Sequence, residues 1–335
     1  MKRKILFAIA MVLAISCGLV THKASAQVDA HFSQYYAYPL WLNPGLTGVM
    51  DGDFRISANY KRQWAEVANP YSTTALSFDT YPVKNLGLGG TIVNQAAGDG
   101  GYNYLNALLS AAYSVVMDES QMNVISIGIQ AGIINRRINP SKLQFGDQWN
   151  PITGFDPGAP SGETFDKTSS LGFDANVGIV YYNRNPNTRL NPFGGISLYH
   201  LPRPHDPFLG KEDERLPMRM NIHGGVKIKM APQFNLTPQF IYIRQGNAHE
   251  TALGLYAQYR LPNYSDLLFG ATYRVDDAIA PFVGFHLGDF TLGLSYDVNM
   301  SDLKAASQSK GGLEISLSYI RHKKIRDPRF ICPRL

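Results

Sequence analysis

The sequence has 335 residues, of which 44% are hydrophobic and 17% charged, and its formal net charge is +5. Four of its 31 Lys and Arg lie within residues 1–26, which contain no acid, so the rest of the chain carries 27 cations against 26 acids. This near balance excludes the strongly basic surface that is typical of a nucleic-acid-binding protein.

Residues 1–26 have the features of a cleaved secretory signal peptide. Three cations precede an apolar run, and a tripeptide of small residues ends at Ala26, where a signal peptidase would cut. A lipoprotein signal at Cys17 is disfavoured because no leucine stands three places before it. After cleavage Cys332 is the single cysteine, which excludes an intramolecular disulfide framework. No later segment approaches the ~18 apolar residues of a membrane helix, which leaves a membrane β-barrel open.

Residues 27–51 contain an aromatic stretch, HFSQYYAYPLWLNPGLTG at 31–48, with six rings in its first eleven residues if the imidazole is counted. Pro39 and Pro44 remove backbone donors and favour extended geometry before them, so we expect neither a good helix nor a barrel strand. We predict that this stretch plugs the periplasmic opening of a barrel and buries its rings there. The predicted plug residues are His31, Phe32, Tyr35, Tyr36, Trp41, Asn43 and Pro44.

From residue 52 onward, apolar and polar residues alternate, as they do in strands with two different faces. In the first such segment Arg55 and Lys61 belong to one face, and Ile56 and Tyr60 to the other. No amphipathic helix competes with this pattern. About fourteen strands are predicted, at 53–62, 71–80, 86–95, 102–116, 121–134, 170–182, 191–200, 218–230, 233–245, 249–260, 266–275, 278–287, 289–299 and 311–320.

Three features favour a transmembrane barrel over a soluble sandwich. The predicted strands are longer than the roughly five or six residues common in sandwiches and reach the nine to eleven or so that a bilayer requires. Tyr or Phe tends to close the apolar rows, as in interfacial girdles. If both termini are periplasmic, the long connections 135–169 and 201–217 fall on the outer side and the short ones on the inner side. We predict an all-β, antiparallel up-and-down barrel, with a signal peptide at 1–26, a plug at 27–51, the barrel at 52–320 and a basic tail at 321–335.

The candidates for catalysis or metal binding are weak. His200, His205 and Asp206 lie among prolines without a further ligand at a suitable spacing, so a polar outer loop is favoured over a metal site. The acidic run 212–214 lacks the donor pattern of a calcium loop. His223 is interpreted as a lumen wall residue instead of a general base. No nucleophile elbow or phosphate-binding loop is present, so we predict no enzymatic activity, no metal and no cofactor.

The two long outer connections are predicted to carry a partner surface. Loops of this length are usually functional or disordered, and their aromatic residues argue against disorder. A loop that merely covers the barrel mouth is the alternative. The candidate partner-binding residues are Phe145, Trp149, Phe155, His205 and Phe208. The basic tail 321–335 is expected on the opposite, periplasmic face, where its charge suits an acidic partner.

Five motifs across the mature chain carry a resemblance: HFSQYYAYPLWLNPGLTG at 31–48, RISANYKRQW at 55–64, LQFGDQ at 143–148, ERLPMR at 214–219 and CPR at 332–334. Together they resemble the PorP/SprF family of type IX secretion system outer-membrane proteins of Bacteroidota. Two departures are small: Glu214 stands where aspartate is common, and the chain ends in leucine instead of an aromatic residue.

The resemblance implies a barrel without enzymatic activity that works within or beside the type IX secretion and gliding machinery. Family members are associated with the periplasmic ring of that system, or with export and surface retention of a large adhesin that carries a C-terminal signal domain. The implied partners are outer-membrane lipid, such an adhesin or its C-terminal domain, and periplasmic secretion components. The alternative is a diffusion porin or hydrophobic-ligand channel, since lumen-facing Arg55, Lys61, Arg219 and Lys227 would suit an anion pore.

Overall fold

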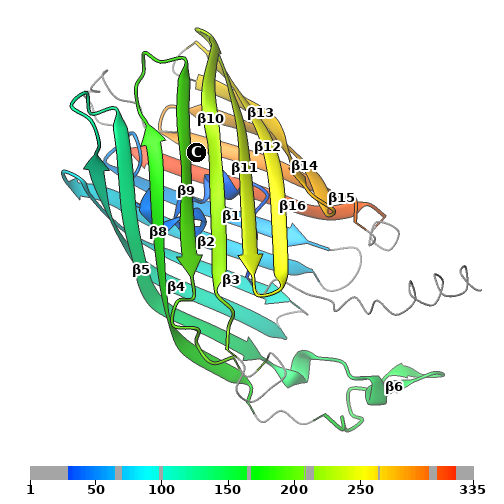
Figure 1. Ribbon diagram of the computed structural model, residues 1–335. Helices are drawn as coiled ribbons and strands as arrows, with labels where there is room; N and C mark the ends of the chain where they lie inside the picture. Colours follow the sequence, from blue (N-terminus) through cyan, green and yellow to red (C-terminus); the bar gives the residue numbers. More distant parts are fainter. Residues whose placement is uncertain are drawn as a thin grey trace, which may run out of the picture.

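A closed barrel of fourteen antiparallel strands forms the body of the molecule (Figure 1). The computed structural model describes residues 29–64, 70–97, 101–163, 167–206, 208, 215–262, 265–301 and 308–321. The predicted signal peptide and nearly all of the basic tail lie outside these ranges. Each strand pairs with its neighbours in barrel order, and β1 closes the barrel against β16. Within the described ranges, no helix has the length and apolar character needed to cross a membrane.

The predicted fold class is confirmed, and the strand bounds shift by a few residues. The largest shift is in β5 (Asn123–Ile138), expected to end at 134, because its pairing with β4 continues to its last residue. The other barrel strands are β1 (Phe54–Gln63), β2 (Tyr71–Val83), β3 (Leu86–Ala97), β4 (Tyr102–Val116), β8 (Ser169–Asn183), β9 (Leu190–Tyr199), β10 (Arg219–Ala231), β11 (Phe234–Gln245), β12 (Ala248–Leu261), β13 (Ser265–Arg274), β14 (Ala278–Leu287), β15 (Phe290–Asn299) and β16 (Lys310–Arg321).

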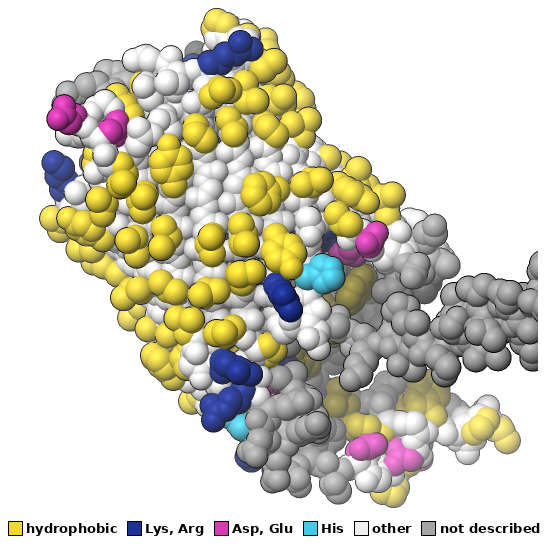
Figure 2. Space-filling view, viewed as in Figure 1, with side chains coloured by type: hydrophobic (Ala, Val, Ile, Leu, Met, Phe, Trp, Pro, Cys, Tyr) yellow, Lys and Arg dark blue, Asp and Glu magenta, His cyan; other side chains and the backbone are white. Residues whose placement is uncertain are grey.

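Alternate residues of each strand meet two different environments. On β1, Arg55 and Lys61 are buried inside the barrel, whereas Ile56 and Tyr60 are exposed on the outside. Figure 2 shows hydrophobic side chains over much of the outer wall, with charged groups mainly toward its ends. A polar interior and an apolar exterior are expected of a barrel surrounded by lipid, where closure also satisfies every edge strand.

The two ends of the barrel differ in the length of their connections. At the turn end, connections such as 232–233 are short; at the loop end, residues 139–168 join β5 to β8 and residues 200–218 join β9 to β10. The first long connection contains a small hairpin of β6 (Trp149–Asn150) and β7 (Gly154–Phe155), which projects away from the barrel wall (Figure 1). This hairpin was not predicted, because strands of two residues show no periodicity.

Residues 29–50, hereafter the plug, lie inside the barrel and take no part in its sheet. They form three short helical turns, η1 (Tyr35–Ala37), α2 (Pro39–Leu42) and η2 (Pro44–Leu46), drawn in blue in Figure 1. Pro39 and Pro44 begin their turns, where a missing N–H breaks no hydrogen bond. No turn exceeds four residues, so the stretch forms neither a good helix nor a barrel strand; what the sequence did not indicate is that two of the single turns start at the prolines.

The placement of the plug also differs from the expectation. The plug was predicted to close only the periplasmic opening. In the structure, it runs through the barrel interior from one end to the other. Asp29 contacts His200 and Arg219 at the loop end, whereas Gly48 contacts Asp79 and lies against Gly87 near the turn end. Polar side chains of the barrel wall bind the plug at both of its ends. The plug therefore extends along the whole lumen.

Candidate functional site

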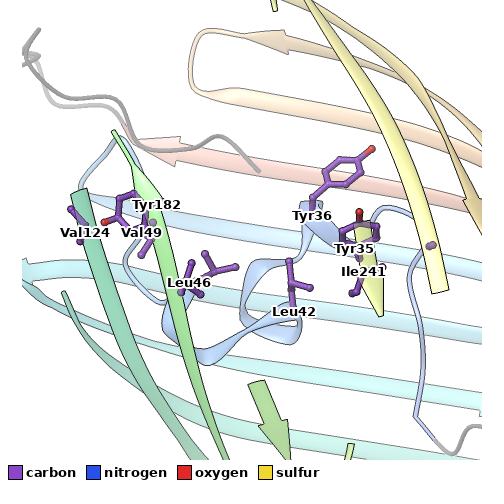
Figure 3. Packing of buried hydrophobic residues seen from close by; sticks show 10 residues of the cluster. Tyr35, Tyr36, Leu42, Leu46, Val49, Val124, Tyr182 and Ile241 are labelled. Atoms are coloured by element: carbon purple, nitrogen blue, oxygen red, sulfur yellow. The ribbon is translucent and has the colours of Figure 1, made fainter. Parts of the chain in front are cut away.

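Apolar side chains of the plug form two clusters with the lumen wall. The first contains Tyr35, Tyr36, Leu42, Leu46, Val49, Val124, Val180, Tyr182, Ile241 and Ala252 (Figure 3). The second contains Ala30, Phe32, Tyr38, Trp41, Ala75, Val93, Tyr104, Ile134 and Leu216. Fully burying one such large side chain stabilises by about 1.5–3 kcal/mol. The predicted plug aromatics thus hold the segment against opposite walls of the lumen.

Asn43 anchors the middle of the plug to the barrel. Its side chain is fully buried, and Nδ2 donates to the carbonyl oxygens of Ile179 and Ile196, each at 3.2 Å. Its Oδ1 accepts from the backbone N–H of Gly45 at 2.9 Å and so caps the turn η2. Donor and acceptor are both used, as a buried amide requires.

Three glycines on adjacent strands make room for this anchor. A Cβ atom at Gly178 on β8 would lie 2.1 Å from Asn43 Oδ1, and one at Gly195 on β9 would lie 2.8 Å from Asn43 Nδ2. A Cβ atom at Gly128 on β5 would lie 2.2 Å from the carbonyl oxygen of Pro44. Asn43 and Pro44 were predicted as plug residues, but the three glycines that they contact were not, although glycine at lumen-facing positions of successive strands was a usable signal.

Asp29 anchors the start of the plug at the loop end. Its Oδ2 lies 2.7 Å from Nη1 of Arg219 and 2.8 Å from Nε2 of His200, and its Oδ1 accepts from the Tyr104 hydroxyl at 3.0 Å. Nδ1 of His200 lies 3.0 Å from Asp174. Each charged group here has a partner of opposite sign, which is what allows all of them to be buried.

These contacts change the pKa values of the two groups that lie outside the strands. Burial alone would raise the pKa of Asp29, but His200 and Arg219 hold it below its usual range. Burial alone would lower the pKa of His200, but the carboxylates of Asp29 and Asp174 raise it to about 9. Asp29 and His200 therefore form a charged pair at neutral pH.

Arg219 also packs between two aromatic rings. Its guanidinium carbon lies 4.4 Å from the ring centroid of Trp41 and 4.1 Å from that of Tyr199. The hydroxyl of Tyr199 donates to the carbonyl oxygen of Trp41 at 2.9 Å, and Nε1 of Trp41 donates to that of Ala30 at 3.0 Å. Such cation–π contacts are strongest when they are desolvated, as here.

A second charged cluster holds the plug where the barrel closes. Lys61 and Glu314 face each other across the β1–β16 pair. The carboxylate of Glu314 accepts the backbone N–H of Ser33 at 2.7 Å and of Gln34 at 3.1 Å. Asp297 accepts from Ser33 Oγ at 2.6 Å and pairs with Lys61 at 3.1 Å. Residues of β1, β15 and β16 therefore close the barrel and bind the plug together.

A third cluster binds the plug near the turn end. Arg55 contacts Asp79 through two nitrogens, at 3.0 Å and 2.8 Å, and donates to the carbonyl oxygen of Leu46 at 3.2 Å. Asp79 accepts the backbone N–H of Gly48 at 2.8 Å. Gly48 has φ +75°, and a Cβ atom there would lie 2.6 Å from the Cα of Gly87, so a side chain would be strained and would collide. A Cβ atom at Gly87 would lie 2.2 Å from the carbonyl oxygen of Thr47.

The lumen-facing cations named by the alternative pore hypothesis have partners. Arg55, Lys61 and Arg219 point inward as expected, but each is buried and bound to a carboxylate. Lys227 has the same phase on β10 and is half-buried. The three buried cations thus hold the plug and present no free charge to a passing anion. The acids that bind them, with Asp29 foremost, were missed because nothing local in the sequence marks them.

The predicted partner-binding residues fall into two groups. Trp149 and Phe155 face each other across the β6–β7 hairpin, with ring centroids 6.0 Å apart, and Phe145 precedes the short turn η4 (Gly146–Gln148) that leads into the hairpin. Trp149 is 55% exposed, and Ile152 at the hairpin tip is 93% exposed. This group forms an apolar projection.

The second group lies at the barrel mouth. The ring of Phe208 is 5.8 Å from the guanidinium of Arg136, which also pairs with Asp206. His205 forms a β-bridge with Arg215. Phe208 and His205 therefore belong to the covering of the mouth, and the five residues do not form one continuous surface.

The weak chemical candidates have structural roles. Among the described residues, no group of three His, Cys, Asp or Glu has the geometry of a metal site. His200 binds the plug, and Nε2 of His223 lies 3.3 Å from Nδ2 of Asn43. The acidic run 212–214 lies outside the described residues.

Three cavities adjoin the plug within the described part of the chain. A vestibule of about 730 Å³ opens at the loop end, and a cavity of about 30 Å³ lies below it; both are lined by Asp29, His31 and Glu250. A third cavity, of about 80 Å³, lies toward the turn end beside Tyr36 and Arg55. Of these three, the two inner cavities beside the described plug residues are small, and the larger one opens at the loop end.

Residues 24–319 match the family described as type IX secretion system membrane protein PorP/SprF. This chain belongs to the PorP/SprF family. A search of curated proteins gives no match. A PorP/SprF protein is an outer-membrane protein of type IX secretion.

Solved structures similar to this PorP/SprF chain include channels and porins, at low sequence identity. The CymD monoaromatic hydrocarbon channel is 14% identical, with 89% of this chain and 96% of that chain covered and a TM-score of 0.46. The P. putida toluene transporter TodX is 9% identical, with 84% and 93% covered and a TM-score of 0.46. The KdgM porin is 8% identical, with 80% and 99% covered and a TM-score of 0.38. Similarity this low says nothing about what the PorP/SprF chain binds.

Proposed function

We propose that this PorP/SprF protein is a non-enzymatic barrel that supports export or surface anchoring of a large secreted protein, an adhesin, through the C-terminal signal domain of that protein. In this proposal the signal peptide is cleaved near Ala26, and the barrel lies in outer-membrane lipid with its loop end outside the cell. The observation that carries it is an apolar, internally bonded hairpin projecting from the loop end of a barrel whose interior is filled (Figure 1).

The hairpin has the properties of a binding surface. The backbone N–H of Asp156 donates to the carbonyl oxygen of Gln148 at 2.9 Å, and Nε2 of Gln148 donates to that of Ala159 at 3.0 Å. A segment organised by its own hydrogen bonds loses less entropy when it binds. Exposed Trp149 beside Ile152 supplies the large apolar anchors on which interface hot spots depend.

The filled lumen weighs against an open diffusion pore as the main function. A porin needs a continuous aqueous passage, whereas here the plug side chains occupy the interior and bind its charges. On the periplasmic side, the basic tail 322–335, beyond the described residues, is proposed to contact an acidic component of the secretion machinery.

The test is retention of the secreted partner at the cell surface. Trp149→Ala combined with Phe155→Ala should release the partner into the medium, because losing one hot-spot anchor typically costs at least about 1–2 kcal/mol of binding, about tenfold in affinity. The variant barrel should remain in the membrane in unchanged amount. Met117→Ala, which shortens an exposed apolar residue at the turn end, is the matched control.

A second experiment tests the periplasmic face of the barrel separately from the loop end. Truncation after Arg321 should impair export and leave the anchoring of protein already at the surface intact. If the double alanine variant retains its partner as the parent does, the hairpin is not the anchoring surface and the proposed division is wrong.

A further inference from the structure

Strands β8 and β9 share the shortest ladder among the described strands of the barrel. Only residues 177–182 of β8 pair with β9, whereas β5 pairs with β8 over its whole length, from Ser169 to Asn183. At the loop end, residues 169–176 therefore extend past the end of β9 (Figure 1). One side of this overhang bonds to β5, and no described strand lies along its other side.

The backbone groups of alternate residues in the overhang point to this open side. The carbonyl oxygen of Ala175 points there, since it accepts the N–H of Leu201, just beyond β9, at 3.0 Å. In an antiparallel strand the N–H and C=O of one residue point to the same side, and the side alternates along the chain. Leu171 and Phe173 therefore also face the open side. Within the described part of the chain, neither has a backbone hydrogen bond there.

The segment that follows β9 lies against the overhang without continuing the ladder. Pro202 and Pro204 have no N–H to donate, and the N–H of Arg203 donates back to the carbonyl oxygen of His200 at 2.9 Å. His200 (φ +58°) and Arg203 (φ +47°) both have left-handed backbone geometry, which interrupts an extended chain. The segment therefore cannot act as the missing strand.

Side chains hold this segment against β8. Pro204 packs on the lumen-facing side of Gly172, where an added Cβ atom would lie 2.6 Å from the Cβ of Pro204. The hydroxyl of Ser170 donates to the carbonyl oxygen of His205 at 3.2 Å. Neither contact uses the backbone groups on the open side of β8, so these groups stay available to a further strand.

The open edge emerges where the outer wall changes from apolar to polar. The outward side chains of Leu171 and Phe173 are 68% and 60% exposed. On β5, the residue paired with Phe173 is Ile133. The residue paired with Leu171 is Asn135. Apolar outward residues mark the part of a barrel that faces lipid, and an open edge cannot lie within it. The edge at Leu171 is therefore reached from the loop end.

We infer that this edge of β8 takes an extended strand of the exported partner by β-strand addition. In this binding mode, backbone hydrogen bonds give affinity and alternate side chains give specificity. Exposed Leu171 and Phe173 would be cross-strand neighbours of the added strand, which should carry apolar residues at alternate positions. The inference takes the identity of the partner from the proposed function and adds how that partner is bound.

A second copy of this chain is not the source of the strand. Two copies in one membrane are related by a two-fold axis along the membrane normal. Barrel strands are tilted by about 35–45° to that direction. The axis would therefore make the two β8 strands cross at a large angle, and crossed strands cannot form a ladder. The strand must come from a different protein.

The first experiment needs no partner. It measures amide hydrogen exchange of the mature protein in lipid nanodiscs, residue by residue, by NMR. Exchange should be fast at Leu171 and slow at Ser170 and Gly172, whose N–H groups face β5. Equally slow exchange at all three positions would show that the edge is already closed, and would overturn the inference.

The second experiment removes the donor at the edge. Leu171→Pro deletes an N–H that faces away from β5, so the β5–β8 ladder stays intact. Leu171→Ala, which keeps the N–H, is the matched control. The probe is the surface protein that parent cells retain and that cells lacking the barrel release. Its retention should be about two- to tenfold lower with proline than with alanine, the effect of one lost hydrogen bond.

A further pair of variants keeps the test decisive. Ser169→Pro removes the next donor on the same side, at the first position of the strand, where proline is tolerated; Ser169→Ala is its control. The inference is overturned if neither proline variant weakens retention below its alanine control. Release by Trp149→Ala with Phe155→Ala would then still support anchoring at the hairpin. If cells lacking the barrel release no surface protein, the proposed function fails, and hydrogen exchange alone decides whether the edge is open.

Discussion

At the scale of single residues, the absence of side chains matters as much as their presence. Asn43 uses its amide fully, and it can do so only because Gly178 and Gly195 let the plug backbone approach the wall. In most strands a lumen-facing glycine weakens packing. In this protein, lumen-facing glycines lie where the plug backbone contacts a strand that is distant in sequence.

Gly178→Ala should therefore destabilise the protein. The new Cβ atom would lie 2.1 Å from Asn43 Oδ1 and 2.8 Å from Pro44 Cδ, and overpacking of this kind costs about 1–3 kcal/mol. The measurement is the free energy of unfolding by urea in lipid vesicles. Gly90→Ala is the control, because its added Cβ meets nothing closer than 3.4 Å. Equal stability of the two variants would contradict the proposed seat.

At the scale of elements, the plug is an irregular segment that the lumen holds at its start, middle and end. Its three helical turns are too short to be stable alone, so the wall must hold them in place. The contacts at Asp29, Asn43 and Gly48 come from different strands. The plug is therefore an element whose conformation depends on the completed barrel.

The docking of the plug start should depend on pH. His200 faces Asp29, Asp174, Arg219 and, beyond Asp29, Tyr104. Because its pKa is raised from 6.5 to about 9, its stabilising contribution is complete below pH 6.5 and is lost as the pH rises through 9. The lowered pKa of Asp29 acts in the other direction, so its contribution is present above pH 3.8 and is lost on acidification below that value.

The loss of stability at alkaline pH is the sharper of the two measurements. Between pH 6.5 and 10 the free energy of unfolding in vesicles should fall by up to about 3 kcal/mol through His200. His200→Gln, which starts less stable, should lack this part of the decline. Parallel curves for the parent protein and the variant would rule out the charged pair of His200 with Asp29.

At the scale of the whole molecule, the barrel, the plug and the outer loops have separate tasks. The apolar outer wall faces lipid, the plug occupies the lumen, and the hairpin projects from the loop end (Figures 1 and 2). Because the strands close on themselves, the barrel does not need the plug to satisfy its backbone. Removing the plug should leave a barrel that still spans the membrane.

Deletion of residues 31–48 should convert the protein into a large open pore. The clusters around Ser33, Asn43 and Gly48 would lose their partners, and water would fill the polar lumen. Conductance in planar bilayers should rise well above that of the parent protein, and deletion of 149–155 should not change the conductance of the parent. A parent protein that already conducts as strongly as the deletion would contradict a filled lumen.

The strand pattern was readable from the sequence because its cause is local. A strand in a bilayer meets lipid on one face and the lumen on the other, so alternation such as Ile56 against Arg55 reports the fold directly. The two prolines similarly excluded the aromatic stretch from the sheet, and the length of the 139–168 connection marked the loop end. Each of these signals acts within a few residues.

Only the tertiary structure decided where the plug lies and what holds it. Its anchors join residues far apart in the chain, such as Ser33 with Glu314 and Asp29 with Arg219. No local pattern encodes such pairs, because they meet only when β1 and β16 close the barrel around the segment. The order of the chain could not indicate, for the same reason, that the plug has contacts at both ends of the barrel. The plug binds wherever buried charges and small residues offer partners, and these line the lumen from end to end.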